Sequence, residues 1–232
     1  MFRYEILGSS SKGNCYLLHT SKATLILECG LHYKEIYKAL DFDLSKVAGC
    51  LITHEHNDHA KEAKHLAKMG VDIYASVGTL NKLKMLDHHR SKFASHLKPL
   101  KVGEFEIIPF NVQHDAEEPL GFLIEHPEMG RLLFATDTFY IKYTFPGLNY
   151  IMVECNYSKE ILDRNDINPT LKKRILSSHL SIDHLLEFLQ ANDLSQVKEI
   201  ILMHLSDSNS HEKDFIKQVQ SLTGIPVKTI TY

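Results

Sequence analysis

The chain has 232 residues, of which 44% are hydrophobic and 24% are charged, and its formal net charge is −3. This is the composition of an ordinary globular protein that is long enough to bury a core. The net charge excludes a general attraction to polyanions, so nucleic-acid binding requires a local patch. No apolar run approaches the roughly 18 residues of a membrane span, and the first residues lack the pattern of a signal peptide.

The four cysteines lie in or beside apolar runs and form no CxxC pair. This spacing favours reduced, buried thiols over a disulfide framework. Together with the missing signal pattern, it predicts a cytoplasmic protein without membrane association. The sequence leaves the oligomeric state open, a homodimer included.

The first half of the chain alternates short apolar runs with Gly- and Ser-rich connections and helical patterns. Strands are expected at residues 2–7, 15–19, 24–28, 47–52 and 72–75, and helices at 33–40, 61–69 and 76–86. Gly70 is the expected C-terminal stop of the helix 61–69. Residues 87–96 are polar and irregular, and the sequence assigns no role to the region 83–96.

The second half begins as a strand meander and continues with βα units. Strands are expected at residues 97–100, 105–112, 120–126, 132–135, 150–154, 198–203 and 227–230, and helices at 159–163, 169–177, 182–190 and 212–222. Asn168-Pro169 is expected to open one helix, and Ser181 to cap the next. No linker or change in composition separates the halves, so the sequence predicts one domain, residues 1–232, of α/β class with two mixed sheets and helices outside.

Residues 53–60 carry three histidines and one aspartate in the pattern H-x-H-x-D-H. They follow the expected strand 47–52 and precede a helix, and a strand that ends in a tight turn can direct His54, His56, Asp58 and His59 to one point. Imidazole and carboxylate are ligands of borderline divalent metals. This histidine stretch, residues 53–60, therefore predicts a metal site in preference to a polar turn with accidental histidines.

Four further candidates stand beside expected elements downstream. His114, Asp137 and His204 each follow an apolar strand, and His179 closes a helix. Each alone is a weak signal, because a polar residue after a strand is common. As an ordered series behind the histidine stretch, they indicate that the metal site draws on the whole chain.

These motifs resemble those of the metallo-β-lactamase-fold hydrolases over nearly the full chain. Within that superfamily the sequence resembles the YycJ/WalJ branch of exonucleases, and His179-Leu180-Ser181 is similar to the His-Ser-Thr element of ribonuclease Z. Besides the histidine stretch, residues 8–14, 114–119, 135–138 and 204–209 carry the resemblance. It implies an αββα four-layer sandwich with a metal-binding groove at the sheet edges.

The resemblance also implies a ligand set for two divalent ions. One ion would be held by His54, His56 and His114, and the second by Asp58, His59 and His204, with Asp137 bridging both. Nitrogen and oxygen donors of this kind favour Zn²⁺, and Mn²⁺ also suits the second position. A dinuclear centre with a bridging carboxylate is suited to hydrolysis.

The resemblance to ribonuclease Z assigns His179 as the proton donor to the leaving oxygen, and Asp58 is assigned to catalysis beside its ligand role. His179 stands just before the expected cap Ser181, and a helix N-terminus lowers the pKa of a histidine. The sequence therefore predicts that a bound phosphate restores the protonated form. The residues assigned to substrate binding are Ser9, Ser10, Asn14 and Ser206. The first three lie in an expected loop whose backbone amides could cradle an oxyanion, although taken alone this loop is better interpreted as an ordinary hairpin loop.

The predicted enzyme is a dinuclear metal-dependent phosphodiesterase that acts on nucleic acid, a DNA exonuclease by resemblance. Two alternatives stay open: a phosphodiesterase of cyclic nucleotides or another small phosphodiester, and a non-catalytic metal-binding regulatory module. The complete ligand set argues against the module. The basic run Lys172-Lys173-Arg174 decides nothing between the substrates, because nearby acidic residues make it equally a solvated helix face.

The sequence departs from the family pattern after the third expected strand. Family members often have Asp-Ala-Gly there, whereas this chain has Glu28-Cys29-Gly30. Glu28 retains the capacity to accept hydrogen bonds behind the metal ligands. No insertion of more than a hundred residues of the β-CASP type is present, so the large RNA-cleaving members are poor guides.

Overall fold

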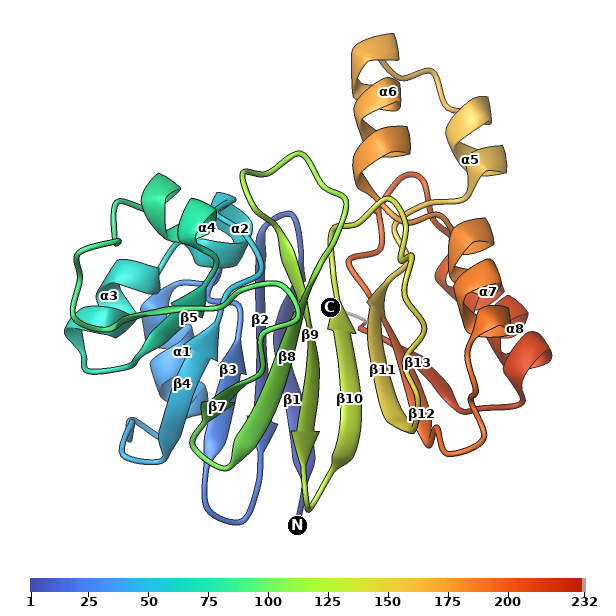
Figure 1. Cartoon of the computed structure of the whole chain (residues 1–232). Coiled ribbons are helices and arrows are strands. Elements are labelled where there is room, and N and C mark those ends of the chain that lie inside the picture. Colours follow the sequence, from blue (N-terminus) through green and yellow to red (C-terminus); the bar gives the residue numbers. More distant parts are fainter. Residues whose placement is uncertain (231–232) are drawn as a thin grey trace. The chain divides into compact units, whose positions relative to one another are not determined.

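The computed structural model of the chain describes residues 1–230 (Figure 1). It divides into two compact units. The first comprises Met1–Asn111 and Ala116–Met129, and the second comprises Val112–Asp115 and the chain from Gly130 onward. The histidine stretch belongs to the first unit, and the downstream candidate ligands belong to the second. The single hydrolase domain expected over residues 1–232 stays a prediction.

Six strands of the first unit form a sheet in the order β1-β2-β3-β4-β5-β6. β1 to β3 are antiparallel neighbours, whereas β3 to β6 are parallel. The strands span Arg3–Ser10 (β1), Gly13–His19 (β2), Thr24–Leu27 (β3), Val47–Leu51 (β4), Ile73–Ala75 (β5) and Ser91–Phe93 (β6). Because parallel strands end at one edge, the residues that follow β3, β4 and β5 emerge there together.

Helices of the first unit cover one face of this sheet (Figure 1). They are α1 (Tyr33–Ala39), α2 (Asn57–Ala60), α3 (Ala63–Lys68) and α4 (Val77–Lys82). Leu66 of α3 and Leu80 of α4 join Ile26 and Cys50 of the strands in one buried apolar cluster. Each such side chain contributes about 1.5–3 kcal/mol of hydrophobic stabilisation, so this packing anchors the helices that flank the histidine stretch.

Several local expectations for the first unit are wrong. The expected hairpin loop 8–14 is shorter than predicted, because β1 extends to Ser10 and β2 begins at Gly13. The expected helix 61–69 is present as the shorter α3, and the short helix α2, which lies inside the histidine stretch, was not expected. The expected helix 76–86 ends as α4 at Lys82, and the irregular region after it contains the unpredicted strand β6.

Three further strands of the first unit form an antiparallel meander, as expected from their order in the chain. They are β7 (Leu100–Val102), β8 (Phe105–Asn111) and β9 (Leu120–His126). The strand expected at 97–100 begins only at Leu100, because Leu97 has a left-handed backbone conformation with φ of 54°. The backbone N–H of Leu120 donates to the Thr53 carbonyl at 3.0 Å, which ties β9 to the start of the histidine stretch.

The second unit contains four parallel strands in the order β13-β12-β11-β10. They span Gly130–Ala135 (β10), Leu148–Glu154 (β11), Glu199–Met203 (β12) and Val227–Thr229 (β13). Continuous apolar runs such as 200–203 are typical of parallel strands that are buried on both faces. The prediction of two mixed β-sheets with helices is confirmed.

The helices of the second unit are α5 (Lys159–Arg164), α6 (Pro169–Ser178), α7 (Ile182–Ala191) and α8 (Glu212–Thr223). Both expected caps are confirmed: the side chain of Asn168 accepts from the Thr170 N–H, and that of Ser181 from the His184 N–H. α8, at 12 residues, ends at Gly224 with φ of 69°, a left-handed conformation suited to glycine. Within residues 1–230, every helix is too short or too polar to cross a membrane.

Candidate metal centre

The histidine stretch emerges from β4 at the edge where β3, β4 and β5 end. His54 is 1% exposed and His59 is fully buried. Nε2 of His54 lies 3.0 Å from Nδ1 of His56, and the rings of His54 and His59 have their centroids 4.2 Å apart. A carboxylate oxygen of Asp58 lies 3.4 Å from Nε2 of His59. The structure therefore brings the four predicted ligands of the stretch together.

Helix α2 carries Asp58 and His59, and its position depends on Gly30. A Cβ atom on Gly30 would lie 1.6 Å from the Asp58 carbonyl oxygen, so any other residue here would displace the helix. The backbone N–H of Cys29 donates to the His59 carbonyl at 2.7 Å. The glycine after β3 thus allows α2 to dock directly against the strand end.

Two buried polar side chains support His59. Nδ2 of Asn14 lies 3.1 Å from Nε2 of His59 and donates to the Asp58 carbonyl at 3.2 Å. Oε1 of Glu28 lies 3.6 Å from Nδ1 of His59 and accepts from the Thr53 N–H at 3.3 Å. Burial raises the pKa of Glu28, opposed by its contacts with His59 and Thr53. Glu28 thus stands behind His59, and the role of Asn14 in substrate binding stays a prediction.

In the second unit, candidate ligands meet where three parallel strands end. The register places the last residues of β10, β11 and β12 within one position of one another, and Asp137, Glu154 and His204 lie at these strand ends. All three are at most 5% exposed. Nδ1 of His204 donates to the Asp137 carboxylate and lies 3.9 Å from Oε1 of Glu154. Parallel pairing therefore gathers residues that lie 67 positions apart in the chain.

Strained backbone conformations occur both beside the histidine stretch and among the strand-end candidates of the second unit. Glu28, Asp137 and His204 have φ values of 62°, 47° and 52°, in the left-handed region that non-glycine residues rarely adopt. Such a conformation costs about 1–2 kcal/mol per residue, and surrounding structure must enforce it. All three residues directly follow a strand or lie within two positions of its end. Strain at these points indicates that the strand ends are shaped for a site and not only for packing.

His179 forms a buried pair with Glu154. Its Nδ1 donates to Oε1 of Glu154 at 2.6 Å, and Oε2 of the same carboxylate accepts from the N–H groups of Thr138 and Leu180 at 2.9 and 3.0 Å. Burial alone lowers the pKa of His179, but the charge and hydrogen bond of Glu154 outweigh it and raise this pKa to about 9. The expectation that only a bound phosphate restores the protonated form is wrong, because the carboxylate already does so.

His114 joins this group from the short segment 112–115 of the second unit. Its Nδ1 donates to the Ser178 carbonyl at 2.9 Å, which leaves Nε2 3.5 Å from the Asp137 carboxylate. Burial lowers the pKa of His114, opposed chiefly by the charge of Asp137, and so favours the neutral imidazole that binds metals. The hydrogen bond to a carbonyl fixes the ring orientation in the way typical of metal-binding histidines.

The three serines that were predicted to bind substrate make structural contacts within the protein. Ser9 is 5% exposed and its hydroxyl accepts from the Tyr16 hydroxyl at 2.7 Å, so it serves the packing of the hairpin. Ser10 lies at the end of β1, paired with Gly13 across the hairpin. The N–H of Ser206 donates to the Asn156 carbonyl at 2.9 Å, and its hydroxyl accepts from the Asn209 N–H at 3.2 Å. Their roles toward substrate stay predictions.

Glu154 is the functional candidate that the sequence interpretation missed. Together with Asp137, His179 and His204 it offers ligand atoms that all lie within 4.8 Å of one another. A signal was present in the sequence, because Glu154 is a carboxylate at the end of an apolar strand. It was not recognised because Glu154 is the last residue of the strand itself, where a polar residue is common, whereas the other strand-end candidates follow their strands.

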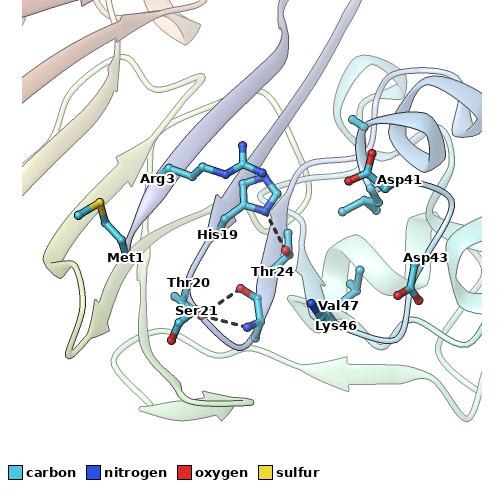
Figure 2. Close-up of a pocket in the computed structure, with 13 residues that line it drawn as sticks. Met1, Arg3, His19, Thr20, Ser21, Thr24, Asp41, Asp43, Lys46 and Val47 are labelled. Carbon is cyan, nitrogen blue, oxygen red and sulfur yellow. Dashed lines mark hydrogen bonds between the residues drawn. The ribbon is translucent and has the colours of Figure 1, made fainter.

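A pocket of about 260 Å³ lies at the other ends of the strands of the first sheet, where β3 and β4 begin (Figure 2). It is bounded by Thr24 and Val47, which begin β3 and β4, whereas the histidine stretch follows the end of β4. Its charged lining is of both signs, as Lys46 and Asp43 illustrate in Figure 2. Its one histidine, His19, is bonded to the Thr24 hydroxyl at 2.9 Å. This pocket lacks the chemistry of the histidine stretch.

Comparison with known proteins defines the class. The family model described as "Beta-lactamase superfamily domain" matches residues 34–205. The metallo-β-lactamase-fold protein YhfI from Bacillus subtilis superposes with a TM-score of 0.77 over 99% of this chain and 96% of its own, at 15% identity. The chain belongs to the metallo-β-lactamase-fold hydrolases, a superfamily of metal-dependent enzymes, and the predicted fold class is confirmed.

Two curated relatives are similar over most of their length. Exodeoxyribonuclease YycJ of Bacillus anthracis is 31% identical over 90% of this chain and 84% of its own. Exodeoxyribonuclease WalJ of Streptococcus pneumoniae (strain D39) is 32% identical over 97% of this chain and 87% of its own. The resemblance to the YycJ/WalJ branch is therefore confirmed.

The donor set fits divalent ions. Asp137 and Glu154 are buried carboxylates at one strand edge, and two such charges are costly to bury together unless a cation or a protonated group balances them. His179 balances Glu154, while Asp137 faces imidazoles that bind metals in their neutral form. The buried imidazoles of the histidine stretch have the same character. These residues suit a divalent metal centre.

Proposed function

We propose that this protein is a dinuclear metal-dependent phosphodiesterase that hydrolyses nucleic acid, as a DNA exonuclease. The observation that carries the proposal is the buried cluster of Asp137, Glu154, His179 and His204, which combines metal-ligand chemistry with a protonated histidine. Two relatives, both exodeoxyribonucleases, support the substrate class.

The proposed ligands are the seven residues expected from the sequence, four from the histidine stretch and three from the strand ends of the second unit. The set is His54, His56, Asp58, His59, His114, Asp137 and His204. Family membership and the gathering of each group within its own unit support this assignment. When bound, two divalent ions supply Lewis acidity toward a phosphodiester and a water molecule; the donor types favour zinc, with manganese as the second choice.

His179 is the proposed donor of the proton that the leaving oxygen requires. Its Nδ1 is held by Glu154 at 2.6 Å, so Nε2 is the atom that can face a substrate. Glu154 in turn is fixed by two backbone N–H groups, which keeps the imidazole orientation constant while the proton moves. Glu154 is a positioning residue in this scheme.

We also infer a cytoplasmic location. The four cysteines are free and buried, which suits a reducing compartment. Burial raises the pKa of Cys15, Cys50 and Cys155, so these thiols are poor metal donors and packing residues instead.

The test is an assay of the purified protein in Zn²⁺ or Mn²⁺ on labelled single- and double-stranded DNA, RNA and cyclic nucleotides. Asp58→Asn and His179→Ala are compared with the matched variants Asp87→Asn and His89→Ala, whose side chains are exposed. We expect the first pair to lose activity on DNA and the second pair to retain it. Full activity in both Asp58→Asn and His179→Ala would refute the mechanism, and a preference for cyclic nucleotides would refute the substrate class.

A further inference from the structure

The first unit carries a second feature beside the histidine stretch, a hollow of about 310 Å³ whose lining includes four lysines. Lys61 and Lys64 come from the end of α2 and from α3, and Lys82 and Lys84 from the end of α4 and the turn after it. Figure 1 shows α2 and α4 as neighbours above the ends of β4 and β5. We call this set, Lys61, Lys64, Lys82 and Lys84, the lysine groove.

The lysine groove is a local excess of positive charge on a chain whose net charge is −3. All four side chains are exposed, and Glu55 is the one acidic residue of the lining. Within residues 1–230, no carboxylate approaches Lys61, Lys64 or Lys84 within 4.0 Å. Only Lys82 is paired, with Glu117 at 2.9 Å, and that exposed ion pair contributes little. Most of the charge is therefore available to a ligand.

The basic residues of the second unit are different. Lys172 is paired with Asp163 at 2.9 Å, Arg174 with Asp115 at 2.8 Å, and Arg164 with Glu160 on the next helical turn. Their charge is largely compensated on the protein itself. Of the two basic regions, the lysine groove is therefore the one whose positive charges are mostly not paired with carboxylates of the protein.

The groove is also placed beside the candidate ligands. Its lining includes Asn57 and Ala60, the first and last residues of α2, and that helix presents Asp58 and His59 on its other positions. Lys61 follows His59 by two residues. An anion held in the groove therefore lies within about one helical turn of the predicted metal ligands.

We propose that the lysine groove binds the phosphodiester backbone of a nucleic-acid strand next to the phosphate that is cleaved. This inference rests on the proposed function and narrows it. Lysine ammonium groups bind phosphates as point charges, without reading the base, and four of them on two segments match a ligand with several phosphates in a row. A cyclic mononucleotide has one phosphate, which the metal site itself would occupy, and it leaves the lysines without a partner.

The test compares three versions of the full chain by binding and cleavage of a labelled single-stranded oligonucleotide over a range of salt concentrations. K61Q/K64Q/K84Q removes the unpaired charges, and K61R/K64R/K84R keeps them. K38Q/K46Q/K98Q removes three exposed lysines elsewhere in the first unit as a matched control. Thermal unfolding verifies that each variant folds.

We expect K61Q/K64Q/K84Q to raise KM for the oligonucleotide at least tenfold and far more than it lowers kcat. The slope of log affinity against log salt should become shallower by about 2, because each single-strand phosphate contact contributes about 0.7. The arginine variant and the matched control should behave as the wild type. An unchanged KM and salt slope in K61Q/K64Q/K84Q, with normal cleavage by the wild type, would overturn the groove alone. Absence of oligonucleotide cleavage by the wild type would instead overturn the proposed function.

Discussion

Two buried glutamates, one in each unit, lie at strand ends beside a histidine, but the hydrogen bonds that they accept differ in length and number. Glu28 follows β3 and accepts long bonds, 3.3 Å from the Thr53 N–H and with 3.6 Å to His59. Glu154 ends β11 and accepts three short ones, from His179 at 2.6 Å and from the N–H groups of Thr138 and Leu180.

The difference teaches that burial alone does not decide the charge of a carboxylate. Burial raises the pKa of Glu28, because its few long bonds compensate poorly for lost hydration. The charge and bond of Glu154 instead raise the pKa of His179 to about 9 against the burial of the ring. Glu28 therefore lies beside His59 with only long contacts, whereas Glu154 supports a protonated His179 that can donate.

The largest effect should follow from removing one predicted metal carboxylate in each unit. Asp58→Asn and Asp137→Asn keep size and hydrogen bonding, and asparagine tolerates the left-handed backbone of position 137. We expect each to lower kcat/KM by at least about 10³-fold, roughly 4 kcal/mol of transition-state stabilisation, and to lower bound metal measured by mass spectrometry. If only one of the two variants loses metal, the other carboxylate is not a metal ligand.

Glu154→Gln and Glu28→Gln test the contrast between the two glutamates directly. A neutral amide cannot replace the charge that Glu154 offers to His179 and two backbone donors, so we expect its loss to cost about 2–3 kcal/mol of unfolding free energy. Glu28→Gln should cost less than about 1 kcal/mol, because Glu28 makes only long contacts, 3.3 Å from the Thr53 N–H and 3.6 Å from His59, so an amide loses little there. Urea unfolding of the metal-free variants measures both. Equal losses would contradict the distinction.

Asn14→Ala should have an intermediate effect on activity, since Asn14 is not itself a predicted ligand but contacts His59 and both the backbone and the carboxylate of Asp58. Loss of such a supporting bond lowers metal affinity or activity about 10- to 100-fold in other metal sites. Metal titration monitored by activity measures the shift. Asn81→Ala, at an exposed position of the same unit, is the matched control.

The smallest effect concerns pH. The pKa of His179 in the folded, metal-free protein is about 9, above its ordinary value of 6.5, so the stabilisation from this pair is fully present below pH 6.5 and is lost as the pH rises through about 9. An NMR titration of the imidazole should report this pKa directly. In Glu154→Gln, where burial is opposed mainly by the charge of Asp137, the pKa of His179 should fall well below 9; an unchanged value would exclude Glu154 as the cause.

Much of the site was predictable from sequence. The histidine stretch places four donors within six residues, and periodicity located most strands and helices, so the family, the fold class and the main ligand candidates followed. The shortness of the hairpin loop at Ser11-Lys12 and the strand β6 were not predictable, because backbone pairing with neighbouring strands outweighs the local preference of polar residues. The short helix α2 inside the histidine stretch was also not predicted.

The sequence by itself determined which chemistry the chain carries, because imidazole and carboxylate side chains in a contiguous motif are visible without a fold. Only the tertiary structure decided how that chemistry is tuned. Glu154 became the partner of His179 through parallel strand ends and a crossover helix, and the lysine groove arose from two segments about twenty residues apart. Charge and protonation depend on neighbours in space, and parallel β-pairing brings those neighbours from distant parts of the chain.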